Sequence, residues 1–282
     1  MERRQEKTWK IKMNKLEKEL EIAKRTAKEA GRILLARAND DLEVSLKEDK
    51  SLVTKVDKEA SRFITKKLTS NFPDYGILDE ENPEDSRKKN KLCWVVDPLD
   101  GTIEYVNRRE TYGVMIALME DYSPVLGVVY IPKKDELIYA VKGRGAYIEN
   151  GSSKKRINVS DNTKIDVLVT DSRKDNPEMN ELIKKIKPDS ITNMPSAIKI
   201  VEVAKGNYNL FLCPKSVIMS LWDLCAGHII LEEAGGKLTD LNFNKIDYAG
   251  ELRNKNGVIG ITPKIIKEVE RRLGSLEKNL RW

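Results

Sequence analysis

The chain has 282 residues, of which 40% are hydrophobic and 34% are charged, and its formal net charge is +6. This length and composition suit one large domain or two closely packed halves with a substantial buried core. No apolar run approaches the ~20 residues that span a bilayer. The basic segment 1–15 lacks the apolar stretch of a secretory signal and reads as an N-terminal extension. We therefore expect a cytoplasmic protein that does not bind membranes.

Two helices and a set of short strands are predicted for the first half of the chain. Apolar residues recur at helical spacing over residues 16–37, and a second helix begins near Asp57 and ends at Asn71–Pro73. The period then changes to that of strands. Strands are predicted at residues 76–78, 92–96, 112–119, 124–131 and 136–141, the last three as an antiparallel meander.

Strand and helix patterns alternate after about residue 160. Strands are predicted at residues 167–170, 208–212 and 257–261, and helices at residues 177–186, 196–204, 222–234 and 263–273. The expected fold class is a layered α/β (α+β) structure. An N-terminal α+β half, residues 16–160, and a C-terminal α/β half, residues 161–282, would share one interface.

Histidine and cysteine are both scarce. Cys93, Cys213 and Cys225 have no metal-type or redox-type spacing, so reduced, buried thiols of a cytosolic protein are expected. The single histidine, His228, excludes a multi-histidine metal site. A catalytic metal would therefore take oxygen ligands, which suit Mg²⁺, Mn²⁺ or Ca²⁺. We expect His228 to pack its helix or to support the site from behind the residues that touch the ligand, and not to be a catalyst.

The segment Trp94–Thr102 joins a hydrophobic strand to an acidic turn. The strand delivers Asp97 at its end, Asp100 follows three residues later, and Gly101 lets the backbone pass close to a ligand. Paired carboxylates bind a hard cation, and free amides at a helix start bind a phosphate. This combination predicts metal-assisted phosphoryl hydrolysis, although an Asx-turn followed by a helix N-cap accounts for the same residues without a ligand.

Two further acidic segments bear on this choice. Asp79, Glu80 and Glu81 follow a predicted strand, where adjacent acids repel one another unless a cation or solvent relieves them. Asp223 opens a mostly apolar helix, where it is either an ordinary N-cap or a ligand on a rigid platform. Each segment alone is compatible with solvated or capping acids, and together they favour a cation site.

These segments together resemble the signatures of the inositol monophosphatase superfamily of Mg²⁺-dependent, lithium-sensitive phosphatases. Trp94–Thr102 is similar to W-[IV]-[IV]-D-P-[IL]-D-G-T, and Trp222–Gly236 is similar to W-D-x-x-[AG]-G-x-x-[IL]-x-x-[AE]-x-G-G. The similarity covers about residues 16–261 and includes Lys50–Asp57 and Gly143–Tyr147. It implies a layered αβαβα sandwich that is usually dimeric.

The resemblance also implies a metal site. Four acids match the family's metal-binding carboxylates: Glu80, Asp97, Asp100 and Asp223. The backbone carbonyl of Leu99 matches another ligand, for two or three Mg²⁺ ions with Mn²⁺ as a substitute. Asp79 stands where relatives often have Gly or Ser, which leaves open which neighbouring acid is the ligand, and Glu80 is our choice.

The same resemblance implies the catalytic and phosphate-binding groups. Gly101 and Thr102 match the phosphate-binding turn. Thr102 also matches a hydroxyl that, with an acid matching Asp57, helps to orient the attacking water. Because only one histidine is present, we expect water activation to rest on the metal and on the Thr102–Asp57 pair, without a covalent enzyme intermediate.

Segments outside the metal site favour a nucleotide substrate. Asp100–Tyr105 resembles the D-G-T-x-E-[FY] motif of 3′(2′),5′-bisphosphate nucleotidases of the CysQ type, whereas inositol monophosphatases more often have Asn at the position of Glu104. Pro195–Lys199 is similar to the nucleotidase segment G-S-S-x-K, and Cys213–Lys215 is similar to Y-[PL]-R. Pro195 in place of Gly and Lys215 in place of Arg depart from the nucleotidase pattern.

We therefore expect Ser196, Lys199 and Lys215 to bind the substrate. The two lysines would pair with the second phosphate of adenosine 3′,5′-bisphosphate, whose 3′-phosphate would be hydrolysed to give AMP and phosphate. Solvated surface lysines are the alternative. An inositol-1-monophosphatase or a fructose-1,6-bisphosphatase of broad specificity also stays open.

Two other classes of protein have less support. An inactive binding or scaffold homologue is expected to have lost a metal carboxylate, and none is lost. A nucleic-acid-binding role is not supported, because aromatic and basic residues do not alternate in the sequence and the positive charge is spread evenly along it. The expected partner is a small-molecule phosphate ester, and the resemblance implies a homodimer.

Overall fold

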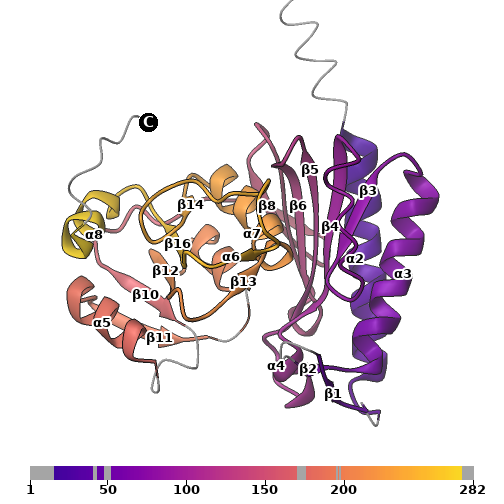
Figure 1. Cartoon of the computed structure of the whole chain (residues 1–282), viewed down its shortest axis with the longest axis horizontal. Helices are drawn as coiled ribbons and strands as arrows, with labels where there is room; N and C mark the ends of the chain where they lie inside the picture. The colour runs from indigo at the N-terminus through magenta and orange to yellow at the C-terminus, as the bar shows by residue number, and fades with distance from the viewer. Residues whose placement is uncertain are drawn as a thin grey trace, which may run out of the picture.

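The computed structural model describes residues 16–40, 43–47, 52–169, 176–194, 196 and 198–274. The predicted extension 1–15 lies outside the described residues, as do Lys50, Ser51, Thr170, Pro195 and Ala197. The chain forms five layers in the order helix, sheet, helix, sheet, helix (Figure 1). This order confirms the expected αβαβα sandwich.

The first layer is a pair of helices, α2 (Glu17–Arg37) and α3 (Lys55–Asn71). Each helix has an apolar stripe at helical spacing that is buried against the first sheet and against the other helix. Thr54 caps α3, and its hydroxyl accepts hydrogen bonds from the amides of Val56 and Asp57. Both helices were predicted, and their ends agree with the prediction to within about two residues.

The second layer is a seven-stranded sheet whose strands lie in sequence order. It comprises β3 (Gly76–Asp79), β4 (Leu92–Asp100), β5 (Gly113–Glu120), β6 (Ser123–Ile131), β7 (Glu136–Val141), β8 (Ala146–Asn150) and β9 (Ser153–Ile157). β3 pairs with β4 in parallel and every other pair is antiparallel, so the predicted meander is confirmed. A single 3-10 turn, η2 (Pro132–Lys134), joins β6 to β7.

The middle layer contains α6 (Lys199–Ala204) and α7 (Leu221–Glu233). From Leu224 to Leu231, α7 is buried on all sides, because it lies between the two sheets (Figure 1). Gly127 on β6 permits this close approach, since a Cβ there would lie 2.5 Å from the carbonyl oxygen of Ala226. α7 thereby brings its first turn to the edge of the first sheet.

The fourth layer is a five-stranded sheet, covered on its outer face by α5 (Pro177–Ile186) and α8 (Ile266–Leu273). Its order is β11 (Ser190–Asn193), β10 (Asp166–Val169), β12 (Leu210–Cys213), β16 (Val258–Ile261) and β14 (Lys237–Thr239). β10 is parallel to both of its neighbours, and the remaining pairs are antiparallel.

Two small strand pairs and one short helix complete the part that the structure describes. β1 (Ser45–Leu46) pairs with β2 (Leu52–Val53), and β13 (Met219–Ser220) pairs with β15 (Arg253–Asn254). The short helix α4 (Thr102–Val106) follows β4 directly. Among the described helices, none combines the length and the apolar character that crossing a membrane requires.

The structure corrects the helix predicted at residues 196–204, which begins at Lys199. Ser196 lies before it with a left-handed φ of 73°, a conformation that cannot continue into a helix. The strands β8, β9, β11 and β14 were not predicted. β9 lies at the sheet edge and carries exposed charged residues such as Lys154 and Lys155, which hide the alternation of a half-buried strand.

Candidate metal centre

A β-bulge in β4 brings its two aspartates to one side of the sheet. Asp97 is paired with Met115, but Asp100 is paired with Gly113, so β4 contains one extra residue between them. In a regular strand residues three apart point to opposite faces, and one extra residue reverses that relation. The strand and the two acids were predicted; the bulge that aligns them was not.

Asp97, Asp100 and Asp223 converge. Each offers a carboxylate oxygen that lies within 4.8 Å of those of the other two, although Asp223 comes from the first turn of α7. Asp97 and Asp100 are buried and Asp223 is half-buried. Loss of hydration raises the pKa of Asp97 well above its usual range, and the charges of Glu80, Asp100 and Asp223 raise it further. A bound cation would relieve the repulsion between these buried carboxylates.

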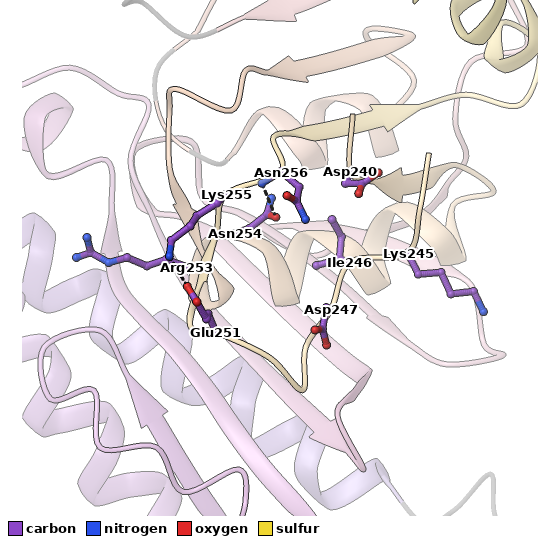
Figure 2. Close-up of a pocket in the computed structure, with 9 residues that line it drawn as sticks. All are labelled: Asp240, Lys245, Ile246, Asp247, Glu251, Arg253, Asn254, Lys255 and Asn256. Carbon is purple, nitrogen blue, oxygen red and sulfur yellow. Dashed lines mark hydrogen bonds and ion pairs between the residues drawn. The ribbon is translucent and has the colours of Figure 1, made fainter. Parts of the chain in front are cut away.

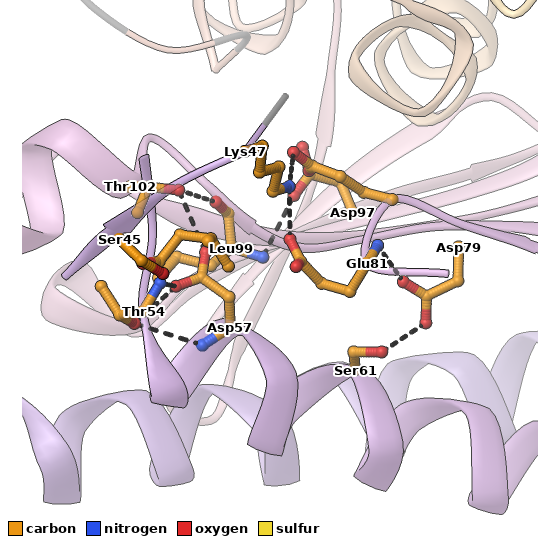
Figure 3. A network of polar contacts seen from close by, with 12 residues as sticks. Ser45, Lys47, Thr54, Asp57, Ser61, Asp79, Glu81, Asp97, Leu99 and Thr102 are labelled. Atoms are coloured by element: carbon orange, nitrogen blue, oxygen red, sulfur yellow. Dashed lines mark hydrogen bonds and ion pairs between the residues drawn. The ribbon is translucent and has the colours of Figure 1, made fainter. Parts of the chain in front are cut away.

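Glu80 adjoins this cluster from the end of β3. Its carboxyl group interacts with that of Asp97, and each affects the pKa of the other. Lys47, just beyond β1, places its Nζ 2.6 Å from Glu81 Oε1 (Figure 3) and 2.7 Å from Glu80 Oε1. Loss of hydration raises the pKa of Glu80, and Lys47 opposes that rise. Lys47 is a functional candidate that the sequence interpretation missed.

Asp57 and Thr102 form the predicted pair. The Thr102 hydroxyl lies 3.0 Å from Asp57 Oδ1 and 3.3 Å from the carbonyl oxygen of Leu99. Asp57 Oδ2 accepts hydrogen bonds from the backbone amide and the hydroxyl of Thr54, at 2.8 and 2.5 Å. Burial raises the pKa of Asp57, and these hydrogen bonds oppose the rise. The capping box of α3 therefore fixes the carboxylate that meets Thr102.

Gly101 is the point at which β4 turns into α4. Its φ is 86°, and a Cβ there would lie 3.0 Å from the Thr111 carbonyl oxygen and 3.1 Å from the Ser196 Cβ. Both the left-handed conformation and the close packing require glycine. The amides of the first turn of α4 have no carbonyl within the helix to bind, so they are available to a ligand.

The predicted substrate-binding residues lie in different environments. The Ser196 hydroxyl donates a hydrogen bond to Asp100 Oδ2, which also accepts one from the Ile198 amide at 3.2 Å. Lys199 is 3% exposed, donates to the Ser196 carbonyl and lies over the ring of Phe211. It is therefore not the solvated lysine of the alternative interpretation.

Lys215 lies on the surface, in the turn after β12. Its backbone amide donates to Glu178 Oε1 at 2.9 Å. No contact between Lys215 and the carboxylate cluster is observed among the described residues. Its assignment to the substrate stays a prediction.

His228 is packed, as expected. It is 8% exposed, with Nδ1 2.7 Å from the Tyr248 hydroxyl and Nε2 3.2 Å from Glu232 Oε1. These contacts occupy both ring nitrogens at a point one and a half turns along α7 from Asp223. We conclude that His228 packs α7 against Tyr248 and does not take part in the carboxylate cluster.

A separate cavity of about 270 Å³ lies in the C-terminal half, beside β15 (Figure 2). None of the predicted site residues lines it. Its acids are already bound, since Lys255 pairs with Glu251 at 2.5 Å and Asp240 accepts the amides of Asn242 and Asn244. The carboxylate cluster, and not this cavity, is the candidate functional site.

The donors of the cluster fit Mg²⁺. All three are hard carboxylate oxygens, and no histidine nitrogen or cysteine sulfur is among them. The raised pKa values of Asp97 and Asp223 follow from burying like charges together, which a divalent cation relieves.

Known proteins resemble this chain over most of its length. The profile of the inositol monophosphatase family matches residues 15–272. The 3′(2′),5′-bisphosphate nucleotidase CysQ of Salmonella typhimurium is 35% identical over 209 residues, which cover 73% of this chain and 83% of that protein. The inositol-1-monophosphatase of Bacillus subtilis is 28% identical over 256 residues, which cover 88% and 94%.

Solved structures give the same result. An inositol monophosphatase (IMPase) of Thermotoga maritima superposes with a TM-score of 0.78 at 27% identity, and the match covers 91% of this chain and 96% of that one. The chain therefore belongs to the inositol monophosphatase family and is a phosphoric monoester hydrolase.

Proposed function

We propose that this protein is a Mg²⁺-dependent phosphatase that removes the 3′-phosphate of adenosine 3′,5′-bisphosphate and releases AMP and phosphate. The observation that carries the proposal is the convergence of Asp97, Asp100 and Asp223 within 4.8 Å, beside the first turn of α4. The identity to nucleotidases of the CysQ type supports the choice of substrate.

Asp97, Asp100, Asp223 and Glu80 would hold two or three Mg²⁺ ions together with the Leu99 carbonyl. Bound Mg²⁺ supplies charge neutralisation for the phosphate and lowers the pKa of water. Mn²⁺, which accepts the same oxygen ligands, would substitute.

Groups of the protein itself would bind the phosphate ester and accept a proton from the attacking water. The amides of Gly101 and Thr102 belong to the start of α4, where free N–H groups can bind phosphate oxygens. The Thr102 hydroxyl, held by Asp57, can accept a hydrogen bond from the attacking water and so orient it. Because the pKa of Asp57 is raised, its carboxylate is a better proton acceptor than an exposed aspartate.

Ser196, Lys199 and Lys215 are proposed to select the substrate. A bisphosphate carries a second anionic group away from the reacting phosphate, and a lysine ammonium is a suitable partner for it. Inositol 1-phosphate has no such group. It remains a second candidate substrate, because the inositol-1-monophosphatase of Bacillus subtilis matches 88% of this chain.

A substrate panel tests the proposal. We expect the highest kcat/KM for adenosine 3′,5′-bisphosphate among that compound, inositol 1-phosphate, fructose 1,6-bisphosphate and histidinol phosphate, each assayed with Mg²⁺ and with EDTA. Loss of all phosphate release in EDTA is expected for every substrate. A higher kcat/KM for inositol 1-phosphate would reject the nucleotidase assignment, and activity that survives EDTA would reject the metal mechanism.

We also infer that the protein is a cytoplasmic homodimer, as its resemblance to the family implies. Light scattering coupled to size exclusion would give a mass near twice the 32.2 kDa of one chain. A mass of a single chain at micromolar concentration would reject the dimer and leave the proposed chemistry unaffected.

A further inference from the structure

One face of α3 carries three polar residues at four-residue intervals. Asp57, Ser61 and Thr65 therefore lie in a row along the helix. Asp57, at the N-terminal end of the row, contacts Thr102. Ser61, one turn further on, contacts Asp79 at the end of β3 (Figure 3), and so does Thr65, two turns further on. The same helix therefore touches both the catalytic pair and the strand end that leads into Glu80.

The carboxylate of Asp79 is bound by three donors. Its Oδ2 accepts the Ser61 hydroxyl at 2.8 Å and the Thr65 hydroxyl at 2.9 Å, and its Oδ1 accepts the Glu81 amide at 2.9 Å. Asp79 is only 2% exposed. A buried carboxylate is stable where several donors satisfy it, and each of them then restricts its position. Asp79 faces α3, which favours Glu80 over Asp79 as the proposed ligand.

These hydrogen bonds shape the turn that carries Glu80 and Glu81. The Glu80 amide donates to the Val96 carbonyl at 3.1 Å, and the Asn82 amide donates to the Asp79 carbonyl at 3.1 Å. With its backbone fixed in this way, the turn directs both glutamates toward Lys47. A hollow of about 670 Å³, lined in part by Ser61, Thr65 and Asp79, lies beside the turn. Because no side chain of the described residues packs against the turn on the side of this hollow, we expect the position of the turn to depend on these hydrogen bonds.

We propose that Asp79, held by Ser61 and Thr65, is a positioning residue that sets the Glu80–Glu81 turn for binding a divalent cation. The row on α3 then aligns two parts of one site, because Asp57 orients Thr102 while Ser61 and Thr65 orient the turn. This inference rests on the proposed function, since it takes Glu80 as a ligand of the metal.

The double variant Ser61→Ala/Thr65→Ala tests the proposal without changing any charge. We expect its affinity for Mn²⁺, measured by isothermal titration calorimetry on metal-free protein, to fall roughly tenfold, as when a group that orients a metal ligand is lost. Thr69→Ala is the matched control. Thr69 lies one turn further along α3, and its hydroxyl bonds to the Thr65 carbonyl and not to Asp79. It is expected to keep the wild-type affinity.

Variants of Asp79 itself separate position from charge. Asp79→Asn keeps an acceptor for the Glu81 amide, and its own amide can donate to the two hydroxyl oxygens. Asp79→Ala loses all of these contacts. We expect the asparagine variant to bind Mn²⁺ more tightly than the alanine variant, although both lack the same charge. In activity assays the Mg²⁺ concentration for half-maximal rate should rise in the order wild type, asparagine, alanine, with KM for substrate unchanged at saturating Mg²⁺.

Two results would overturn the proposal. Equal Mn²⁺ affinity in Ser61→Ala/Thr65→Ala and Thr69→Ala, with native circular dichroism, would show that the contacts of Asp79 do not set the metal site. Equal affinity in the two Asp79 variants would show that only charge matters, and this comparison decides the matter if the double variant fails to fold. Wild-type protein that binds no divalent cation would reject the proposed function together with this inference.

Discussion

The two sides of the carboxylate cluster are built differently. On the first-sheet side, Asp97 and Asp100 come from one strand and Glu80 follows the neighbouring strand, so backbone pairing sets their spacing. On the other side, Asp223 comes from a helix in the middle layer, and its Oδ2 accepts the Ser220 amide at 2.6 Å. The N-cap of α7 is therefore Ser220 and not Asp223, which completes the capping box from the third position of the helix. This capping contact and the proposed ligand role of Asp223 do not exclude each other.

The positive charges on the two sides differ as well. Lys47 contacts Glu80 and Glu81 from a short strand pair, and its side chain is 21% exposed. Lys199 is almost fully buried. Loss of hydration, with the charges of Glu80 and Asp100, raises the pKa of Asp223, and Lys199 opposes that rise. We infer that the first charge can be displaced by a metal, whereas the second is a permanent part of the site.

The largest expected loss of activity is that of a substitution at Asp97, which interacts with acids from both sides of the cluster. Asp97→Asn removes the charge of the carboxylate that interacts with Glu80, Asp100 and Asp223 together. We expect kcat to fall on the order of 10³-fold, with the fold retained. Steady-state assays with circular dichroism check this. Near-normal turnover would show that Asp97 is not at a metal centre, and an exposed acid such as Asp121 changed to Asn is the control.

Metal removal should destabilise the protein in a pH-dependent way. The pKa values of Asp97, Asp223 and Glu80 are raised mainly by loss of hydration, and that of Glu81 rises to about 7. Acids with raised pKa stabilise the fold below their unfolded pKa, and this contribution is lost as pH rises through the folded pKa. Without metal, stability therefore falls from about pH 4 through neutrality.

Mg²⁺ should reverse this loss, because it binds the ionised acids. At about 100 times its Kd it adds about 2.7 kcal/mol to the free energy of unfolding. Thermal unfolding should show a larger Mg²⁺-induced rise in Tm at pH 8 than at pH 5. The same rise at both pH values, or none at either, would contradict the assignment of the cluster as a cation site.

The buried charge can be tested with Lys199→Met, which keeps an apolar stem over Phe211. If Lys199 binds the second phosphate, KM for adenosine 3′,5′-bisphosphate should rise roughly tenfold, equivalent to about 1.4 kcal/mol, with little change for inositol 1-phosphate. Lys215→Ala is the exposed counterpart. Equal losses for both substrates would assign Lys199 to charge compensation of Asp223 alone.

The smallest effect is expected for a substitution of Lys47, the charge that a metal is inferred to displace. Lys47→Met removes a cation that competes with metal for Glu80 and Glu81. We expect several-fold tighter Mn²⁺ binding, since a partly exposed ion pair contributes about 1 kcal/mol. Metal-free protein should lose stability in the same variant. Weaker Mn²⁺ binding would instead show that Lys47 helps to hold the metal-binding acids in place. Lys47 would then be a permanent part of the site, as Lys199 is inferred to be.

Local pattern sufficed for much of the fold. The stripes of α2 and α3 and the strands of the meander were predicted, because a buried face imposes its period on the sequence. The limits of α6 were not, since the left-handed φ of Ser196 depends on its contact with Asp100. The edge strand β9 was missed because four of its five residues are exposed, so no buried face marks it in the sequence.

By itself, the sequence determined which acids and which glycine are available, because carboxylate chemistry and glycine's conformational freedom belong to the residue type. Only the tertiary structure decided that the bulge in β4 aligns Asp97 with Asp100, that α7 delivers Asp223 to them, and that Asp79 turns to α3. Those relations depend on how a segment pairs or packs with other parts of the chain, which no local period in the sequence records.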